Sequence, residues 1–467
     1  MSELYELSVV DTLRAFGDRS VSPSEYLEAI LERIEVAQPV VNALGDRYVE
    51  EARAAARAAE KRYARGDARP LEGLPVAIKD EAAIAGKRAT NGSLLMQNNV
   101  ADRDDPIVER LRAAGAIFHA RTLTPEFEIT FWTASRMWGI TRNPWNVGFD
   151  PGGSSGGSAA ALAAGMTPLA TGSDIGGSIR VPASCCGVVG YKATWGRIPA
   201  PPPVGLDAWY HVGPLARTVS DVALAADVMM GPHPLAHAAI RPPLRIGTPT
   251  ANVRDLRIAV SEDLGDWPVV PSVRAGIRAV ADALRDAGAT VEETDVRIER
   301  SLLRIASDAH YAAAFGTISQ TLIAGHEELL NPYTIRWLAT LQQARGFADG
   351  LEAEGEIQER LSTLFEAYDA LVCPAIGVPA LEAGVDYTEI PLVVDGQSYD
   401  AMREVCPTEI FNVASRCPVL CVPAGRDDAT GVPVGAQIVG RTYEDHIVFR
   451  IGAAVEAALP WPHVAEL

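Results

Sequence analysis

Two glycine–serine clusters lie close together and present hydroxyl groups where a nucleophile could act: GGSSGG at 152–157 and GGS at 176–178. No histidine lies between residues 150 and 184, so a nucleophilic serine here would need a different base. Two glycines directly before Ser178 allow the backbone to turn successive N–H groups toward one point, as an oxyanion hole requires. The second cluster therefore suits acyl transfer by a serine, although a plain tight turn would use the same residues.

The first cluster also matches the G-x-S-x-G pattern of a nucleophile elbow, through Gly153, Ser155 and Gly157. That motif requires a strand directly before it. The preceding segment, TRNPWNVGFDPG, has the composition of a loop, which argues against an elbow. Three later histidines could supply the base of a triad, but none has a local context that marks it: His310, His326 and His446.

Charge and motif content disfavour several other functions. The chain of 467 residues carries a formal charge of −19, so a nucleic acid backbone would be repelled and nucleic acid is not an expected partner. Neither glycine cluster has the spacing of a phosphate-binding loop or of a dinucleotide-binding turn. The six cysteines are scattered, and Cys417 and Cys421 have no further ligand at metal-binding spacing, so no metal site is expected.

The N-terminal segment indicates a cytoplasmic protein. Glu3, Glu6 and Asp11 stand where a signal peptide would have a basic start and an apolar core. No apolar run approaches the roughly 18 residues that a membrane helix needs, so no membrane association is expected.

Alternating helix and strand patterns predict an α/β fold. Residues 7–66 have helical patterns, with Ser22 as an N-cap before Pro23. Short apolar runs predict strands at 74–80 and, after a helix end, within 112–123, and then at 256–260, 288–296, 368–375, 418–425 and 433–440. We therefore expect a mixed central β-sheet with helices on both faces.

Residues 150–184 resemble, nearly position by position, the signature of the amidase signature family of serine hydrolases. The resemblance continues in LEGLPVAIKD, TPEF and TRNPWN upstream, and in CGVVGYKAT, HVGPLARTVSDVA and GVPVGAQIVG downstream. It implies the amidase signature fold in a single domain over residues 1–467. Within it we expect N-terminal helices wrapping the core (1–70), a catalytic core (71–225), a variable helical and pocket region (226–400), and C-terminal core strands with a helix (401–467).

The resemblance also implies a catalytic triad. Lys79 of AIKD matches the family's lysine, Ser154 the bridging serine, which follows a cis peptide bond, and Ser178 the nucleophile. Lys79 follows the apolar run LPVAI, so its amine should be desolvated, and a neutral amine can act as a base. We expect Lys79 to take the proton of Ser154 while Ser154 takes that of Ser178, so no histidine is needed.

Supporting roles are implied by the same resemblance. The oxyanion would be stabilised by the backbone N–H groups of Ile175, Gly176, Gly177 and Ser178. Ser155 and Asp174 would hydrogen-bond the triad and its loop, and Arg180 would be structural. The relay and the oxyanion hole are complete without a metal or organic cofactor, so none is expected.

Aromatic residues near the expected pocket favour an apolar or aryl substrate, either an amide or a carbamate as in urethanases. They are Phe131, Trp132, Trp209 and Tyr311. The main alternative is an amidotransferase component that generates ammonia from glutamine inside a multi-subunit complex, and a non-catalytic amide-binding protein is a third. Glu81 stands where the family often has asparagine, which affects the substrate rather than the catalysis. A homodimer is a further expectation, since dimers are common in the family.

Overall fold

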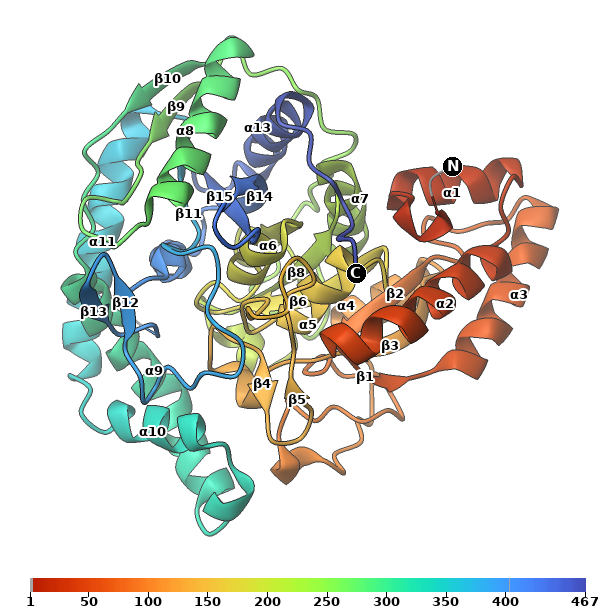
Figure 1. Cartoon of the computed structure of the whole chain (residues 1–467), viewed down its shortest axis with the longest axis horizontal. Coiled ribbons are helices and arrows are strands. Elements are labelled where there is room, and N and C mark those ends of the chain that lie inside the picture. Colours follow the sequence, from red (N-terminus) through yellow and green to blue (C-terminus); the bar gives the residue numbers. More distant parts are fainter. Residues whose placement is uncertain (1–2, 403) are drawn as a thin grey trace.

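The computed structural model describes residues 3–402 and 404–467, without the side chains of 317–322. A large mixed sheet runs through it with eleven strands in the order β1-β3-β2-β6-β8-β7-β14-β15-β11-β9-β10 (Figure 1). The strands come from every part of the chain: β1 Leu44–Arg47, β2 Pro75–Lys79, β3 Ile117–Thr122, β6 Leu169–Asp174, β7 Val189–Lys192, β8 His211–Ala216, β9 Arg257–Val260, β10 Thr290–Glu293, β11 Ala370–Pro374, β14 Val419–Arg426 and β15 Pro433–Gly440.

The centre of the sheet is antiparallel and both ends contain parallel pairs. β2 is parallel to β3 and to β6, and β9 is parallel to β10 and to β11. Between these ends each strand is antiparallel to the next, in the order β6-β8-β7-β14-β15-β11. Because β2 and β6 are parallel neighbours, their carboxyl ends meet at one edge of the sheet, and that edge carries the chemistry described below.

Helices cover both faces of the sheet, as predicted. One face packs against α4 (Pro106–Ala113), α7 (Val219–Met229), α8 (Pro271–Asp286) and α13 (Asp445–Ala458). The other face packs against α2, α3, α5, α6, α9, α11 and α12: Pro23–Val41, Val49–Arg65, Gly156–Ala163, Arg180–Cys186, Arg300–Ile323, Phe347–Ala367 and Ile410–Val413. α1 (Val9–Asp18) and α10 (Pro332–Leu341) lie at the periphery (Figure 1).

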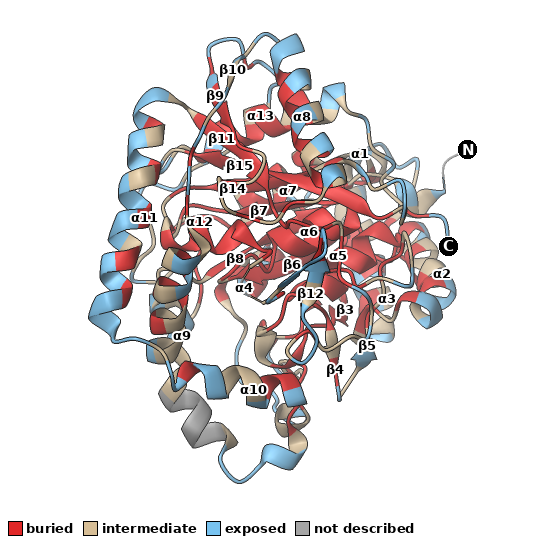
Figure 2. Cartoon of the chain, turned by 60° about the vertical axis from the view of Figure 1, so that its left-hand side comes forward, coloured by how far each residue is buried: buried red, intermediate tan, exposed pale blue. Residues whose placement is uncertain are grey.

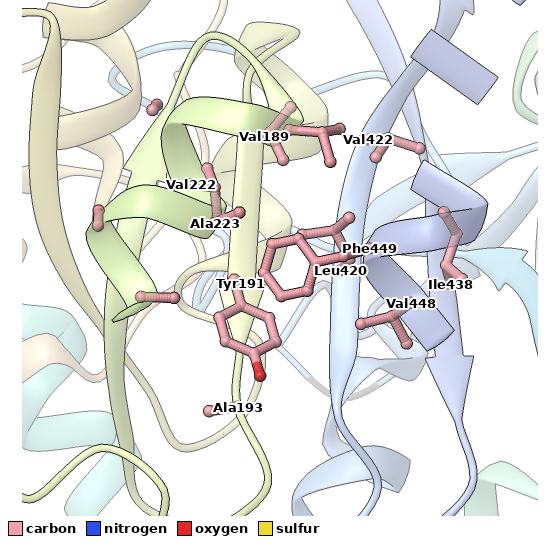
Figure 3. Packing of buried hydrophobic residues seen from close by; sticks show 14 of the residues in the cluster. Val189, Tyr191, Ala193, Val222, Ala223, Leu420, Val422, Ile438, Val448 and Phe449 are labelled. Carbon is pink, nitrogen blue, oxygen red and sulfur yellow. The ribbon is translucent and has the colours of Figure 1, made fainter. Parts of the chain in front are cut away.

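Alternation along the strands builds these two layers, because successive side chains of a strand point to opposite faces. In β2, Val76 and Ile78 join the core under α7 and α13, whereas Ala77 joins the core under α5 and α6. Around Tyr191 on the first of these faces, Phe449 packs edge-on at 4.7 Å, beside Leu420 (Figure 3). Lys79 has the same parity as Ala77, so its side chain is directed toward the α5 and α6 face.

Burial is greatest around the two glycine–serine clusters. Every residue of α5 and α6 is buried, and both helices lie in the buried centre beside the sheet (Figure 2). α11 is exposed along its outer side (Figure 2). Small residues permit this close packing: a Cβ at Gly157 would collide with the backbone of Leu123.

Local sequence signals account for several boundaries. Ser22 caps α2 by accepting a hydrogen bond from the Glu25 N–H, and Pro23 occupies its first turn, as predicted. The apolar runs predicted as strands are all strands of the sheet. The prediction of helices throughout 7–66 is wrong at β1, which pairs antiparallel with β3. Two short hairpins complete the fold: β4–β5 (Ala134–Ser135, Gly139–Ile140) and β12–β13 (Leu392–Val394, Gln397–Tyr399).

Candidate active site

Lys79 is the last residue of β2 and is completely buried. Its Nζ lies 2.8 Å from Ser154 Oγ and 2.9 Å from Ser173 Oγ. Its backbone N–H donates to Thr171 Oγ1 at 3.0 Å, which ties β2 to its parallel neighbour β6. The amine is therefore held by the sheet and directed at a serine hydroxyl.

Ser154 lies on the loop that enters α5, and the peptide bond between Gly153 and Ser154 is cis, as predicted. The next residue, Ser155, donates its N–H to the carbonyl of Ser178 at 3.1 Å. The Ser155 hydroxyl donates to the carbonyl of Ser173 at 3.4 Å. Ser155 thus joins the two glycine–serine clusters and the end of β6.

Ser178 follows a glycine that no other residue could replace without strain. Gly177 has φ of 126°, and a Cβ there would collide with Thr408 Oγ1. The Thr408 hydroxyl in turn donates to the carbonyl of Gly176 at 2.5 Å. Ser178 itself is only 5% exposed. Its loop is therefore fixed from the opposite side by a residue of the C-terminal part of the chain.

The backbone N–H groups of this loop point in different directions. The Gly177 N–H donates to Asp174 Oδ1 at 2.9 Å and the Ile179 N–H to Asp174 Oδ2 at 3.2 Å. Within residues 3–402 and 404–467, no hydrogen bond uses the N–H of Gly176 or of Ser178. Those two donors are available for an oxyanion in this geometry, whereas the N–H of Gly177 is occupied.

Asp174 and Arg180 form a buried ion pair behind the loop. Arg180 Nη2 lies 2.7 Å from Asp174 Oδ1 and Nε lies 2.9 Å from Oδ2. Arg180 also donates to Thr408 O, Gln437 Oε1 and Asn412 Oδ1 at 2.7–2.8 Å. Burial alone would raise the pKa of Asp174, but Arg180 and the Asn412 amide hold it well below its usual range. Arg180 therefore links the Ser178 loop to the C-terminal part of the chain, and its structural role stays a prediction.

Ser154 and Ser178 line one cavity of about 340 Å³. No hydrogen bond between their hydroxyls is found in the described part of the chain. None of the described histidines lines this cavity. His310, one of the candidate triad bases, instead pairs with Asp207 at 3.0 Å and stacks on Trp209. The amine of Lys79, and none of the described imidazoles, therefore lies next to the serines.

The aromatic residues divide into two groups. Phe131 and Tyr311 line the cavity, together with Phe315 and Trp337 of α9 and α10. The expectation that Trp132 and Trp209 line it is not met. Trp132 packs edge-on against Tyr333 at 6.1 Å and against Tyr387 at 5.8 Å. Trp209 is buried and occupied by its stacking on His310 at 4.0 Å.

Carboxyl groups form much of the remaining wall, which sequence reasoning missed. Glu81 Oε2 lies 3.7 Å from Lys79 Nζ. The other acidic residues of the wall are Asp105, Glu128, Asp207, Asp308 and Glu409. Only Glu81 carried a signal, as a departure from the family pattern, because the others lie on segments far apart in the sequence.

Other candidate sites are not formed by the described residues. Cys417 and Cys421 are buried free thiols, and burial raises the pKa of each to about 12. No group of three or more His, Cys, Asp or Glu side chains among residues 3–402 and 404–467 could hold a metal ion. No described helix is long and apolar enough to cross a bilayer.

Comparison with known proteins places this geometry in a family. The family model described as "Amidase" matches residues 25–449. A glutamyl-tRNA(Gln) amidotransferase subunit from Roseiflexus sp. strain RS-1 is 32% identical over 500 residues, covering 99% of this chain and 98% of the relative. An acylamidase of Rhodococcus erythropolis is 32% identical over 468 residues, covering 98% and 96%. A solved bacterial aryl acylamidase of the amidase signature family superposes with a TM-score of 0.91 at 27% identity and covers 98% of both chains.

The chain belongs to the amidase signature family. Its large mixed sheet with helices on both faces is the amidase signature fold, as expected from the sequence. The protein is accordingly a hydrolase that acts on carbon–nitrogen bonds other than peptide bonds. The family does not by itself fix the acyl group or the leaving group, because relatives of similar identity include both an acylamidase and an amidotransferase component.

Proposed function

We propose that this protein hydrolyses amides or carbamates that carry an apolar or aryl group, through an acyl-enzyme on Ser178. The observation that carries the proposal is the buried contact of 2.8 Å between Lys79 Nζ and Ser154 Oγ, beside a cavity that Ser178 shares. A neutral Lys79 amine accepts the Ser154 proton as Ser154 Oγ accepts the Ser178 proton. The hydrogen bond from Ser178 Oγ to Ser154 Oγ forms when the substrate is bound and Ser178 Oγ turns toward the carbonyl carbon of the substrate.

Attack by Ser178 Oγ forms a tetrahedral intermediate with one negative oxygen. The N–H groups of Gly176 and Ser178 can donate to that oxygen without breaking another hydrogen bond, and Ile175 lies next to them. The Gly177 N–H, also expected to contribute, would have to leave Asp174 Oδ1 to do so. Its part in the reaction is to hold the loop.

The intermediate collapses when the carbon–nitrogen bond breaks. Ser154 gives its proton to the departing nitrogen and regains one from the Lys79 ammonium, so an amine leaves and Ser178 remains acylated. A water molecule then donates its proton along the same relay and attacks the acyl carbon, which releases the acid and restores Ser178. For a carbamate, the acid is a carbonate monoester.

The substrate preference is supported by the cavity wall. Phe131, Phe315 and Trp337 present apolar surface to the space in front of Ser178, and Tyr311 adds a ring whose hydroxyl is bonded to Glu409 at 2.7 Å. An aryl group placed there would bury its faces against these rings. The aryl acylamidase neighbour is consistent with this preference.

A hydrolysis panel tests the proposal. Purified wild-type protein, Ser178→Ala and the control Ser362→Ala, which changes an exposed serine on α11, are incubated with an anilide, a primary aliphatic amide, an aryl carbamate and glutamine. We expect release of amine from the anilide or carbamate by the wild type and the control, and none by Ser178→Ala. Equal turnover by Ser178→Ala would refute the acyl-enzyme on Ser178.

A second candidate function is release of ammonia from glutamine as one component of an amidotransferase. It is favoured by the similarity to the glutamyl-tRNA(Gln) amidotransferase component over nearly the whole chain. The panel separates the two: efficient turnover of apolar amides by the isolated chain, with glutamine untouched, supports the hydrolase. Silence on every substrate, with Ser178 still labelled by a fluorophosphonate, supports a component that needs its partners.

A further inference from the structure

One end of the active-site cavity is acidic. Glu81, Asp105 and Glu128 line it near Lys79, and the three reach it from different segments. Tyr210 lies among them: burial raises the pKa of Tyr210 well above its usual range, and all three carboxyl groups raise it further. No lysine, arginine or histidine is among the described residues that line the cavity. A cluster of carboxyl groups around one tyrosine therefore faces the space in front of the serines.

Glu128 carries an unmet hydrogen-bonding requirement at this end. Its Oε1 is buried and makes no hydrogen bond of ordinary geometry with the described residues, although the Thr124 hydroxyl lies near enough to lower the pKa of Glu128. A buried carboxyl oxygen without a partner loses its hydration and gains nothing in return. Burial raises the pKa of Glu128 well above its usual range, and Glu81 raises it further while Lys79 opposes. A donor brought by a ligand would satisfy this oxygen once the carboxyl group turned toward the cavity that Glu128 lines.

Lys79 does not neutralise the whole cluster. Its Nζ lies 3.7 Å from Glu81 and contacts the hydroxyls of Ser154 and Ser173, and the proposed relay requires its amine to be neutral. Burial, and then Glu81, raise the pKa of Asp105 to about 6, so this carboxyl is largely ionised at neutral pH. Arg121, which lies near Asp80 and Asp105, donates to backbone oxygens of Ala82 and Arg88. Arg121 and Arg103 both lower the pKa of Asp105 and so offset part of the negative charge, but neither lines the cavity.

The other acidic residues of the wall are already engaged. Glu409 accepts from Ser307 and Tyr311, and Asp207 pairs with His310. Asp308 lies 3.6 Å from Arg304. These three residues make the rest of the wall acidic, but the carboxyl oxygen without a hydrogen bond, Glu128 Oε1, belongs to the end beside Lys79.

The position of the acidic end relative to Ser154 and Lys79 indicates which part of the substrate lies there. The proposed relay protonates the departing nitrogen through Ser154, so that nitrogen must lie next to Ser154. Lys79 contacts Ser154, and Glu81 contacts Lys79. Groups attached to the departing nitrogen therefore extend toward Glu81, Asp105 and Glu128, while the acyl part extends toward the aromatic wall.

We propose that the cavity end formed by Glu81, Asp105, Glu128 and Tyr210 binds a positively charged group on the leaving amine, so that the preferred substrates release an amine carrying a second, protonated amino group. The inference rests on the proposed hydrolysis through Ser178. An ammonium at this end offers N–H donors to the Glu128 carboxyl group and a positive charge to Glu81 and Asp105, and its charge favours the ionised form of Glu128.

The test uses anilides with one acyl chain and different para substituents. N-hexanoyl anilides bearing aminomethyl, hydroxymethyl or carboxymethyl groups supply a cation, a neutral group of similar size and an anion. The aminomethyl anilide should have kcat/KM about tenfold or more above the hydroxymethyl anilide, the size of one hydrogen bond to a charged group. The carboxymethyl anilide should be the poorest. A ratio of one or less between the first two, with the hydroxymethyl anilide still hydrolysed, would overturn the inference and leave the proposed function standing.

Two variants test whether Glu128 causes the preference for the aminomethyl anilide. Glu128→Gln should lower the ratio of aminomethyl to hydroxymethyl rates about tenfold, and the ratio cancels any general loss of activity or folded protein. Glu359→Gln, an exposed change on α11, should leave the ratio unaltered. An unchanged ratio in Glu128→Gln would overturn the assignment of this residue. A preference seen instead for 6-aminohexanoyl over hexanoyl anilide would place the cation on the acyl side and refute the proposal.

Binding supplies a readout that does not need turnover. Ser178→Ala protein should bind 4-(aminomethyl)aniline about tenfold more tightly than 4-methylaniline in calorimetry, and Glu128→Gln should remove the difference. Equal affinities would overturn the inference. If no anilide were hydrolysed by the wild type while this preference were present, the proposed function would fail and the cation site would remain.

Discussion

The buried pair of Asp174 and Arg180 gives the sharpest quantitative prediction. Both side chains are completely buried, and Arg180 donates five hydrogen bonds, two of them to Asp174. Arg180→Met leaves the Asp174 charge buried without its partner, which should cost about 3–5 kcal/mol of the free energy of unfolding. That is a large fraction of the roughly 5–15 kcal/mol that a folded domain has. Asp174→Asn should cost a similar amount, because it leaves the guanidinium unpaired.

The double variant separates loss of the pair from loss of size and shape. Asp174→Asn with Arg180→Met leaves no buried charge, so its cost should be smaller than the sum of the two single costs by about 2 kcal/mol or more. The measurement is urea denaturation followed by tryptophan fluorescence, with midpoints and slopes compared across the cycle. Arg278→Met, which removes an exposed pair with Glu262, is the control and should cost less than about 1 kcal/mol. Additivity within about 0.5 kcal/mol would refute the reasoning, as would an Arg180→Met cost equal to that of the control.

Three further predictions address the base, the loop and the pH dependence of stability. Lys79→Met should lower kcat/KM at least about 100-fold on the best substrate of the panel, and more than a tenth of wild-type activity near neutral pH would exclude the relay. Gly177→Ala should fold less stably and lose most activity, because φ of 126° and Thr408 both oppose a Cβ; a thermal melt and rate equal to wild type would contradict this. Burial lowers the pKa of His119 to about 4, so between pH 6.5 and 4 this histidine is protonated in the unfolded chain but not in the native state. The free energy of unfolding should therefore fall by about 1.4 kcal/mol for each unit by which the pH is lowered in this range. His119→Gln, which can still donate to Met166 O, should flatten that slope in urea titrations at several pH values, and an unchanged slope would show that other groups govern it.

Sequence patterns predicted the secondary-structure elements whose own residues have a clear strand or helix pattern. Apolar β-branched runs predicted β9, β11 and β14, and the Ser22–Pro23 cap predicted the start of α2. The sequence LATGSD of β6 has small and polar residues with weak strand preference, and pairing on both sides makes it a strand. β1 has four residues at the edge of the sheet, too few for periodicity to distinguish it from the helices on either side.

The same distinction between local sequence pattern and tertiary contacts applies to the residues of the site. The positions of Lys79 and Ser154 could be inferred because they lie in continuous motifs, and the structure brings them within 2.8 Å. The direction of an aromatic side chain is a tertiary property, so the sequence could not tell that Phe131 faces the cavity while its neighbour Trp132 faces Tyr333 and Tyr387. The acidic end could not be predicted either, since Glu81 follows β2 and Glu128 follows β3, and these segments come together only when the two strands pair.

The contacts of Arg180 also determine when the site can form during synthesis of the protein. Its partners Thr408, Asn412 and Gln437 follow it by 228, 232 and 257 residues. A ribosome therefore exposes the loop that carries Ser178 long before it synthesises the residues that hold this loop in position. The growing chain carries Ser178 without its supporting contacts, and these contacts are complete only after residue 437 has been made.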